Sequence, residues 1–127
     1  MKLKVLLLLV VIAVVGAMAA TKEPWNAPAR AAAKKNPIAA DAVSIGRGKA
    51  VYAAECASCH GASGKGDGAA AKDLETPAGD LTKLGGQSDG ALFWKVTEGK
   101  KPMASYATKL TEQQRWDVVN YMKTLGK

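Results

Sequence analysis

Hydrophobic positions recur at helical spacing in three separate segments of the chain. The first runs from Ser44 to about Cys56, with Ser44 as the expected cap and Asp41 as the alternative cap. The face predicted to be buried repeats at intervals of three and four: Ile45, Gly48, Val51, Tyr52 and Glu55 or Cys56. Glycine is unfavourable inside a helix, so Gly48 predicts a close crossing with another helix.

The second predicted helix spans residues 89–98, with Ser88 or Asp89 as its cap and Gly99 at its end. Before it, residues 61–86 contain seven glycines and read as a long loop, within which residues 69–74 could form one or two helical turns. The glycine spacing does not match a phosphate-binding loop.

The third predicted helix has the strongest local signal. Thr111 and Gln114 form a capping box at its start, and the helix is expected to end near Gly126. Its broad apolar face consists of Trp116, Val118, Val119, Tyr121, Met122 and Leu125. Because no stretch alternates like a strand, the predicted fold class is all-α.

The first 19 residues are typical of a secretory signal peptide. A basic start at Lys2 and Lys4 precedes an apolar run and an A-x-A pattern, with cleavage expected after Ala19. The alternative is an uncleaved anchor, although Val5–Ala20 is short of the roughly 20 residues that a spanning helix needs. Either way, the domain is expected to be exported.

Residues 20–43 form an expected extended arm rich in alanine, proline and lysine, followed by one domain over residues 44–127. Trp25 in the arm is expected to dock on the domain's own surface, the alternative being an anchor for a partner protein. Removing residues 1–19 leaves 16 basic and 11 acidic side chains, a formal net charge of +5. Nucleic acid is not an expected partner for an exported domain of this charge.

Cys56-Ala57-Ser58-Cys59-His60 contains both cysteines and the only histidine of the chain. A C-x-x-C-H run is the attachment motif of a c-type haem. Cys56 and Cys59 lie three residues apart, on one face of a helical turn, so both can bond to one macrocycle. His60 then follows beneath the ring, where its imidazole can bind iron.

Other uses of these residues fit less well. A structural zinc ion takes four ligands, and the chain offers three cysteine or histidine side chains. A redox dithiol would accompany a βαβ pattern, and a disulfide between neighbours three apart would close a very short loop. The glycine-rich loop is better explained as a wrapping for a flat macrocycle.

The sixth iron ligand must come from a side chain other than histidine. Two methionines remain in the exported domain, Met103 and Met122. Met122 lies on the apolar face of the last helix and is expected in the core. Met103 follows Pro102 in a loop, where its thioether can be presented opposite His60, so Met103 is the predicted ligand.

Together these segments resemble a class I monohaem cytochrome c of the small, soluble bacterial type. The matching segments are Gly48–Tyr52, Cys56–Gly61, Gly64–Gly68, Asp80–Thr82, Glu98–Met103, Arg115–Trp116 and Asn120–Tyr121. The resemblance implies the cytochrome c fold: three to four helices around one covalently bound haem, with long loops. Many members of this family have proline after the ligand methionine, whereas this chain has Ala104.

The resemblance also implies that the first and last helices cross at close range, Gly48 and Tyr52 meeting Val118 and Tyr121. A loop carbonyl is expected to accept the His60 Nδ1 proton, and Pro77 is the expected donor of that carbonyl.

The implied function is one-electron transport in the periplasm or another extracytoplasmic compartment, and not catalysis. The implied cofactors are one covalent haem c and its iron. The expected partners are redox proteins. Acidic surfaces on such partners could attract lysines of this chain: Lys65, Lys72, Lys83, Lys95, Lys100, Lys101 and Lys109. Membrane association is expected only if residues 1–19 remain. Two alternatives stay open: a tethered cytochrome or subunit of a dehydrogenase or oxidase, and a haem enzyme or gas sensor with an open sixth position.

Overall fold

The computed structural model describes residues 24–127, and the expected signal segment lies outside these residues. Within this range every regular element is helical, which confirms the all-α class; the extended pairing is limited to one isolated bridge between Lys100 and Met103. The elements are α1 (Ala29–Ala32), α2 (Ala42–Glu55), α3 (Ala57–His60), η1 (Ala71–Asp73), η2 (Leu81–Lys83), α4 (Asp89–Glu98) and α5 (Glu112–Met122).

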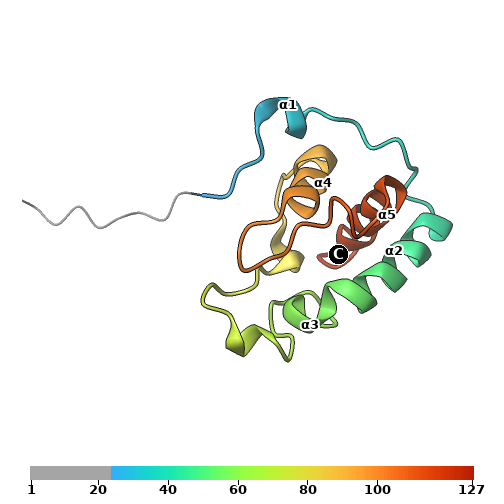
Figure 1. Cartoon of the computed structure of the whole chain (residues 1–127). Helices are drawn as coiled ribbons and strands as arrows, with labels where there is room; N and C mark the ends of the chain where they lie inside the picture. Colours follow the sequence, from blue (N-terminus) through green and yellow to red (C-terminus); the bar gives the residue numbers. More distant parts are fainter. Residues whose placement is uncertain (1–23) are drawn as a thin grey trace, which may run out of the picture.

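Helices α2 and α5 cross at the centre of the molecule, with α4 on the other side of α5 (Figure 1). A Cβ atom at Gly48 would overlap the backbone carbonyl of Asp117, so only glycine permits this approach. Beside it, the rings of Tyr52 and Tyr121 lie 5.2 Å apart. The predicted close crossing at Gly48 is therefore confirmed, with Asp117 as its backbone neighbour.

The core lies where α2, α4 and α5 meet. Its buried apolar side chains are Tyr52, Ala91, Leu92, Phe93, Val96, Tyr106, Leu110, Trp116, Val118, Val119 and Met122. The ring of Phe93 stacks on that of Trp116, with 3.8 Å between centroids. This contact joins α4 to α5, and Met122 has the core position predicted for it.

Local capping signals predict most helix ends correctly. Ser88 Oγ caps α4, and Thr111 and Gln114 form the predicted capping box of α5. The first helix differs, because Asp41 caps it and Ser44 does not. Ser44 lies one turn inside α2, where its buried hydroxyl donates to Asp117 Oδ1 at 2.6 Å. Ser44, the expected cap, therefore makes a hydrogen bond to α5 instead of capping α2.

The last helix is shorter than predicted. It ends at Met122, and Thr124 Oγ1 then bonds to the Tyr121 carbonyl in a following turn. Leu125 still packs against the core from this turn, so the apolar pattern continues beyond the helix itself.

The arm is not extended throughout. Residues 29–32 form the single helical turn α1, and α2 begins at Ala42, inside the range assigned to the arm. Trp25 lies 6.4 Å from Trp94 of α4, which confirms that it docks on the domain's own surface. Among residues 24–127, no helix has both the length and the apolar character needed to cross a membrane.

Candidate haem site

The C-x-x-C-H motif forms a compact turn directly after α2. Cys56 ends α2 and begins α3, and the His60 amide donates to its carbonyl at 2.9 Å. Cys59 and His60 lie in α3 itself. Both cysteines are free and half-buried, so both sulfurs are available for covalent bonds from the same helical turn.

The Cys56 sulfur is not a reactive thiolate. Burial, followed by the charge of Glu55, raises the pKa of the Cys56 thiol to about 11. Catalytic dithiols and metal-binding cysteines depend on the opposite shift. The raised pKa of Cys56 therefore argues against a catalytic or redox-cycling thiolate at this position.

His60 has its Nδ1 atom 2.9 Å from the carbonyl oxygen of Gly79. A carbonyl can only accept a hydrogen bond, so Nδ1 carries the proton and Nε2 keeps a free lone pair. The assignment of this carbonyl to Pro77 was wrong by two residues. The loop packs directly on Gly66, where a Cβ atom would lie 2.6 Å from the Ala78 carbonyl oxygen, and this close approach brings Gly79 to the imidazole.

Met103 lies in a tight turn after α4. The amides of Lys100 and Met103 each donate to the other residue's carbonyl, at 3.1 and 2.8 Å. The Met103 side chain is half-buried and packs against the core, whereas Met122 is only 5% exposed. Met103 is thus the methionine whose thioether remains accessible at the edge of the core.

Tyr106 connects the Met103 turn to the cysteine motif. Its amide donates to the Val96 carbonyl at 3.2 Å, and its hydroxyl donates to the Glu55 carbonyl at 2.9 Å. Glu55 immediately precedes Cys56, so this one side chain ties the turn to the start of the motif. Sequence reasoning missed Tyr106, whose only signal was an aromatic residue three positions after Met103.

Five partly buried apolar side chains from the site segments pack against the core. They come from the cysteine motif, from the η2 segment and from the Met103 turn: Cys56, Ala57, Leu81, Leu84 and Met103. All five contact the core yet keep part of their surface uncovered. An apolar rim with an imidazole, a thioether and two free cysteines is the donor set that suits a haem attached through its vinyl groups.

The chemistry of other metals fits less well. Within residues 24–127, no three histidine, cysteine or carboxylate side chains gather as a metal site would require. Cys56, Cys59, His60 and Met103 therefore could hold a haem, whose porphyrin supplies the remaining iron ligands.

The sequence matches the cytochrome c family over residues 45–126. Cytochrome c6 of a Nostoc species is 40% identical over 90 residues, which cover 71% of this chain and 74% of that protein. Cytochrome c6 of Anabaena variabilis is 39% identical over 63% of this chain and 87% of its own length.

One solved structure is also similar. It is a chain of the reducing HAO-like protein complex of Kuenenia stuttgartiensis, with a TM-score of 0.66 and 31% sequence identity. The match covers 72% of this chain and 47% of that one, so this chain spans about half of its structural neighbour.

The family match contains the whole site, from the C-x-x-C-H motif to the Met103 turn. One covalently bound haem c with its iron follows from this match together with Cys56 and Cys59. The chain belongs to the cytochrome c family and is a small monohaem class I c-type cytochrome.

Proposed function

We propose that this protein is a one-electron carrier that works outside the cytoplasmic membrane, with His60 and Met103 as the axial iron ligands. The observation that carries the proposal is the His60–Gly79 hydrogen bond, since it fixes the ring and engages Nδ1, so that Nε2 is the nitrogen left for iron. The cytochrome c6 relatives support the carrier role.

Each residue has one task in this proposal. Cys56 and Cys59 hold the haem through thioether bonds, so the group cannot dissociate. His60 donates its Nδ1 proton to Gly79 and presents Nε2 to the iron. Met103 presents its thioether from the Lys100–Met103 turn. The haem supplies reversible one-electron chemistry at its iron, and a methionine–histidine pair raises its potential relative to two nitrogen ligands.

The proposed ligand set leaves no position for a substrate. If His60 and Met103 both bind the iron, no position on it would remain for a substrate, and the haem would supply one-electron chemistry alone. This is the physical reason to propose a carrier and not a haem enzyme or a gas sensor.

The absorption spectrum and carbon monoxide binding test the proposal. The oxidised protein is expected to show an iron–thioether absorption band, and the reduced protein is expected to resist carbon monoxide. Rapid carbon monoxide binding by the native reduced protein, together with absence of that band, would favour the enzyme or sensor alternative.

Export is part of the proposal and rests on residues 1–19. Their basic start, apolar run and A-x-A pattern support a cleaved signal peptide. The intact mass of the exported protein should equal residues 20–127 plus one haem. A mass that includes residues 1–19 would instead support a membrane anchor.

Exposed lysines support docking to an acidic redox partner. Lys65, Lys72, Lys100 and Lys101 are exposed and lie in the loops around the site, with no acidic partner within residues 24–127. Lys109 contributes less to the positive charge available for docking, because it pairs with Glu55 at 2.9 Å. We expect the association rate with an acidic partner to fall as salt rises. A salt-independent rate would exclude steering by these lysines.

The structural neighbour supports a second candidate function. Since it belongs to a multi-subunit complex and this chain spans 47% of it, a cytochrome of this type can form part of a larger redox protein. Isolation under native conditions distinguishes the two: a free carrier elutes alone at its monomer size, whereas a subunit elutes with an oxidoreductase.

A further inference from the structure

Residues 24–41, here called the strap, lie across α4 and α5 although the family match begins only at residue 45. The strap runs past α4, turns through α1 and crosses to the start of α2 (Figure 1). Its alanine, proline and lysine content is typical of a segment that stays in solvent. Specific contacts hold it against the domain nevertheless.

The first contact is aromatic. The ring of Trp25 lies 6.4 Å from that of Trp94, tilted by 55°, and the Lys95 ammonium is 5.4 Å from the Trp25 ring centroid. Tilted aromatic pairs and cation–π contacts both stabilise a docked tryptophan. The outer end of the strap is therefore fixed to α4.

The second contact brings the strap backbone against the start of α4. The Ser88 hydroxyl donates to the Ala32 carbonyl at 2.6 Å. A Cβ atom at Gly90 would lie 2.6 Å from the Lys34 carbonyl oxygen and 2.9 Å from that of Ala32. The strap can lie this close to α4 only because residue 90 has no side chain.

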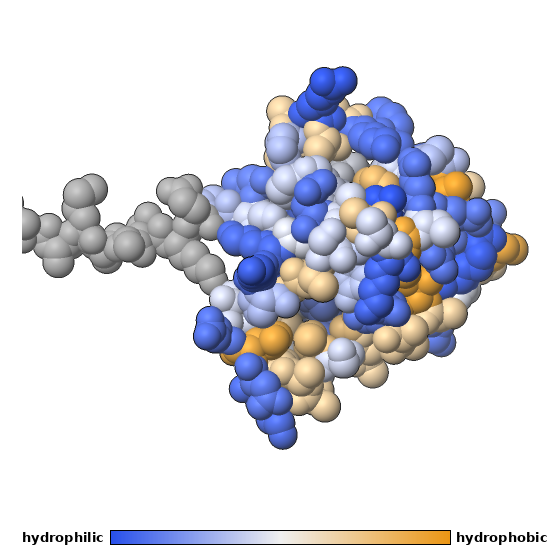
Figure 2. All heavy atoms as spheres, in the orientation of Figure 1, coloured by the Kyte–Doolittle hydropathy of each residue, from blue (hydrophilic) through white to orange (hydrophobic). Residues whose placement is uncertain are grey.

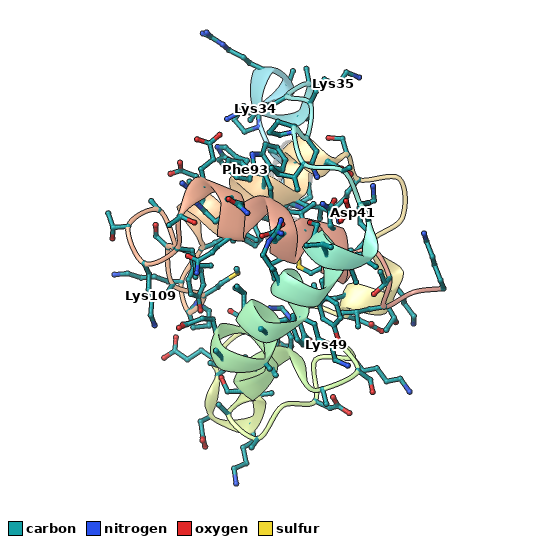
Figure 3. All side chains as sticks on the ribbon, turned by 90° about the vertical axis from the view of Figure 1, so that its right-hand side faces the viewer. Lys34, Lys35, Asp41, Lys49, Phe93 and Lys109 are labelled. Carbon is teal, nitrogen blue, oxygen red and sulfur yellow. The ribbon has the colours of Figure 1, made fainter. Side chains whose placement is uncertain are left out.

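The third contact reaches both α4 and α5. The Lys34 ammonium lies 4.9 Å from the Phe93 ring centroid and 5.7 Å from that of Trp116, and 3.5 Å from a Glu112 oxygen. In Figure 3, Lys34 extends toward Phe93 while Lys35 points outward. Lys34 therefore covers the stacked pair that joins the two helices.

The fourth contact is a shared amide. Asn36 Nδ2 donates to Asp89 Oδ2 at 3.1 Å and to Asn120 Oδ1 at 2.8 Å. Asn120 in turn donates to the Ile38 carbonyl at 3.2 Å. One strap side chain thus bridges the start of α4 to the buried face of α5.

Helix α4 leads directly into the turn that presents Met103. Its last turn is tied to α5 and to the segment after Met103, because Arg115 donates to Thr97 Oγ1 at 2.6 Å and Ser105 to the Thr97 carbonyl at 2.6 Å. Its first turns contact the strap along one side, and they also meet α5 through the Phe93–Trp116 stack and Lys123, which follows α5. The strap therefore covers the end of α4 opposite the end that leads into the methionine turn.

We propose that the strap positions α4 and thereby keeps Met103 on the iron. This proposal rests on the proposed ligation by Met103. Trp25, Lys34, Asn36 and Gly90 are positioning residues, since they act on Met103 through α4. When the strap is displaced, α4 can tilt and the thioether bond becomes labile.

A pair of glycine variants tests this proposal. Gly90→Ala places a methyl group against the strap backbone, whereas Gly46→Ala adds the same group on α2 with nothing within 4 Å. We expect Gly90→Ala to speed tryptic cleavage at Arg30, Lys34 and Lys35 by roughly tenfold, since cleavage follows the open population. We also expect it to weaken the iron–thioether band and to admit carbon monoxide. Gly46→Ala should change none of these.

Trp25→Ala provides a second route, because it removes a strap contact without adding bulk to α4. It should give the same three changes. If the strap is cleaved faster while band and carbon monoxide binding stay native, the strap is only a cover and the proposal is wrong; unchanged cleavage in both variants would also contradict it. Met103→Leu measured alongside separates the two proposals, because retention of the band in that variant would refute the ligand assignment itself.

Discussion

At the scale of single residues, hydrogen bonds to backbone carbonyls organise the site. Gly79 fixes the protonated nitrogen of His60, and Glu55 accepts from Tyr106. Neither acceptor could be predicted from the sequence, because every residue has a carbonyl and only the folded loop determines which one comes near. Of the two donors, His60 could be predicted, since it is the only histidine and stands beside the two cysteines, whereas Tyr106 was missed.

Tyr106→Phe tests the link between the methionine turn and the cysteine motif. Removing the hydroxyl deletes the hydrogen bond to Glu55 and should lower the free energy of unfolding by about 1 kcal/mol. Tyr121→Phe is the control, because that hydroxyl has no hydrogen bond within residues 24–127. Denaturant unfolding measures both, and equal losses would contradict the proposed link.

Asp117 is a buried carboxylate with a strong pH signature. Burial alone would raise its pKa, but hydrogen bonds from Arg47 and Ser44 outweigh burial and hold the pKa below its ordinary value. A depressed folded pKa stabilises the protein above about pH 4, and this stability is lost as the pH falls through the folded pKa.

Asp117→Asn should therefore lower the free energy of unfolding at pH 7 by about 2 kcal/mol. The difference from the wild type should shrink as the pH falls below about 4, because the unfolded carboxylate takes up a proton there while the native one, with its lowered pKa, stays ionised. Asp73→Asn, at an exposed position, is the control. A difference that stays constant from pH 7 to pH 3 would show that the charge of Asp117 does not matter.

At the scale of secondary structure, the sequence correctly predicted the helix caps that depend only on neighbouring residues. The capping box at Thr111 and the cap at Ser88 depend on residues within one turn, and both are confirmed. The cap of α2 was wrong because Ser44 bonds to Asp117, 73 positions away in the chain. The docking of the strap likewise depends on Gly90 and Trp94, which a composition of alanine, proline and lysine does not reveal.

The crossing of α2 and α5 is tested by two glycines of the same helix. Gly48→Ala would force α5 away from α2, and such overpacking should cost about 1–3 kcal/mol of stability. Gly46→Ala meets no neighbour and should be neutral or stabilise by up to about 1 kcal/mol through helix propensity. Thermal unfolding compares them, and similar melting temperatures would contradict the close crossing.

At the scale of the whole molecule, the visible face is mostly hydrophilic, while part of the apolar core is incompletely covered by protein. Figure 2 shows hydrophilic residues over most of one face and a paler, weakly hydrophobic area along the lower edge, over α2 and α3. Helix α2 has exposed alanines, such as Ala50 and Ala53. The apolar rim around Cys56, Leu81 and Met103 is only half-buried by protein, so the haem is expected to complete the core.

Loss of haem attachment should therefore unfold much of the domain. The double variant Cys56→Ala/Cys59→Ala removes both thioethers and should lose most of its helical circular dichroism and its cooperative melting. Its control is the wild-type protein purified from the same cells with its haem. A double variant that still melts cooperatively at the wild-type temperature would show that the protein core is sufficient alone.

The central claim is that Met103 is the sixth iron ligand, and the spectra of two methionine variants test it most directly. Met103→Leu should lose the iron–thioether absorption band and bind carbon monoxide when reduced. Met122→Leu, at a buried core position, should keep the band and exclude carbon monoxide. A Met103→Leu protein that folds and retains the native band would contradict the assignment.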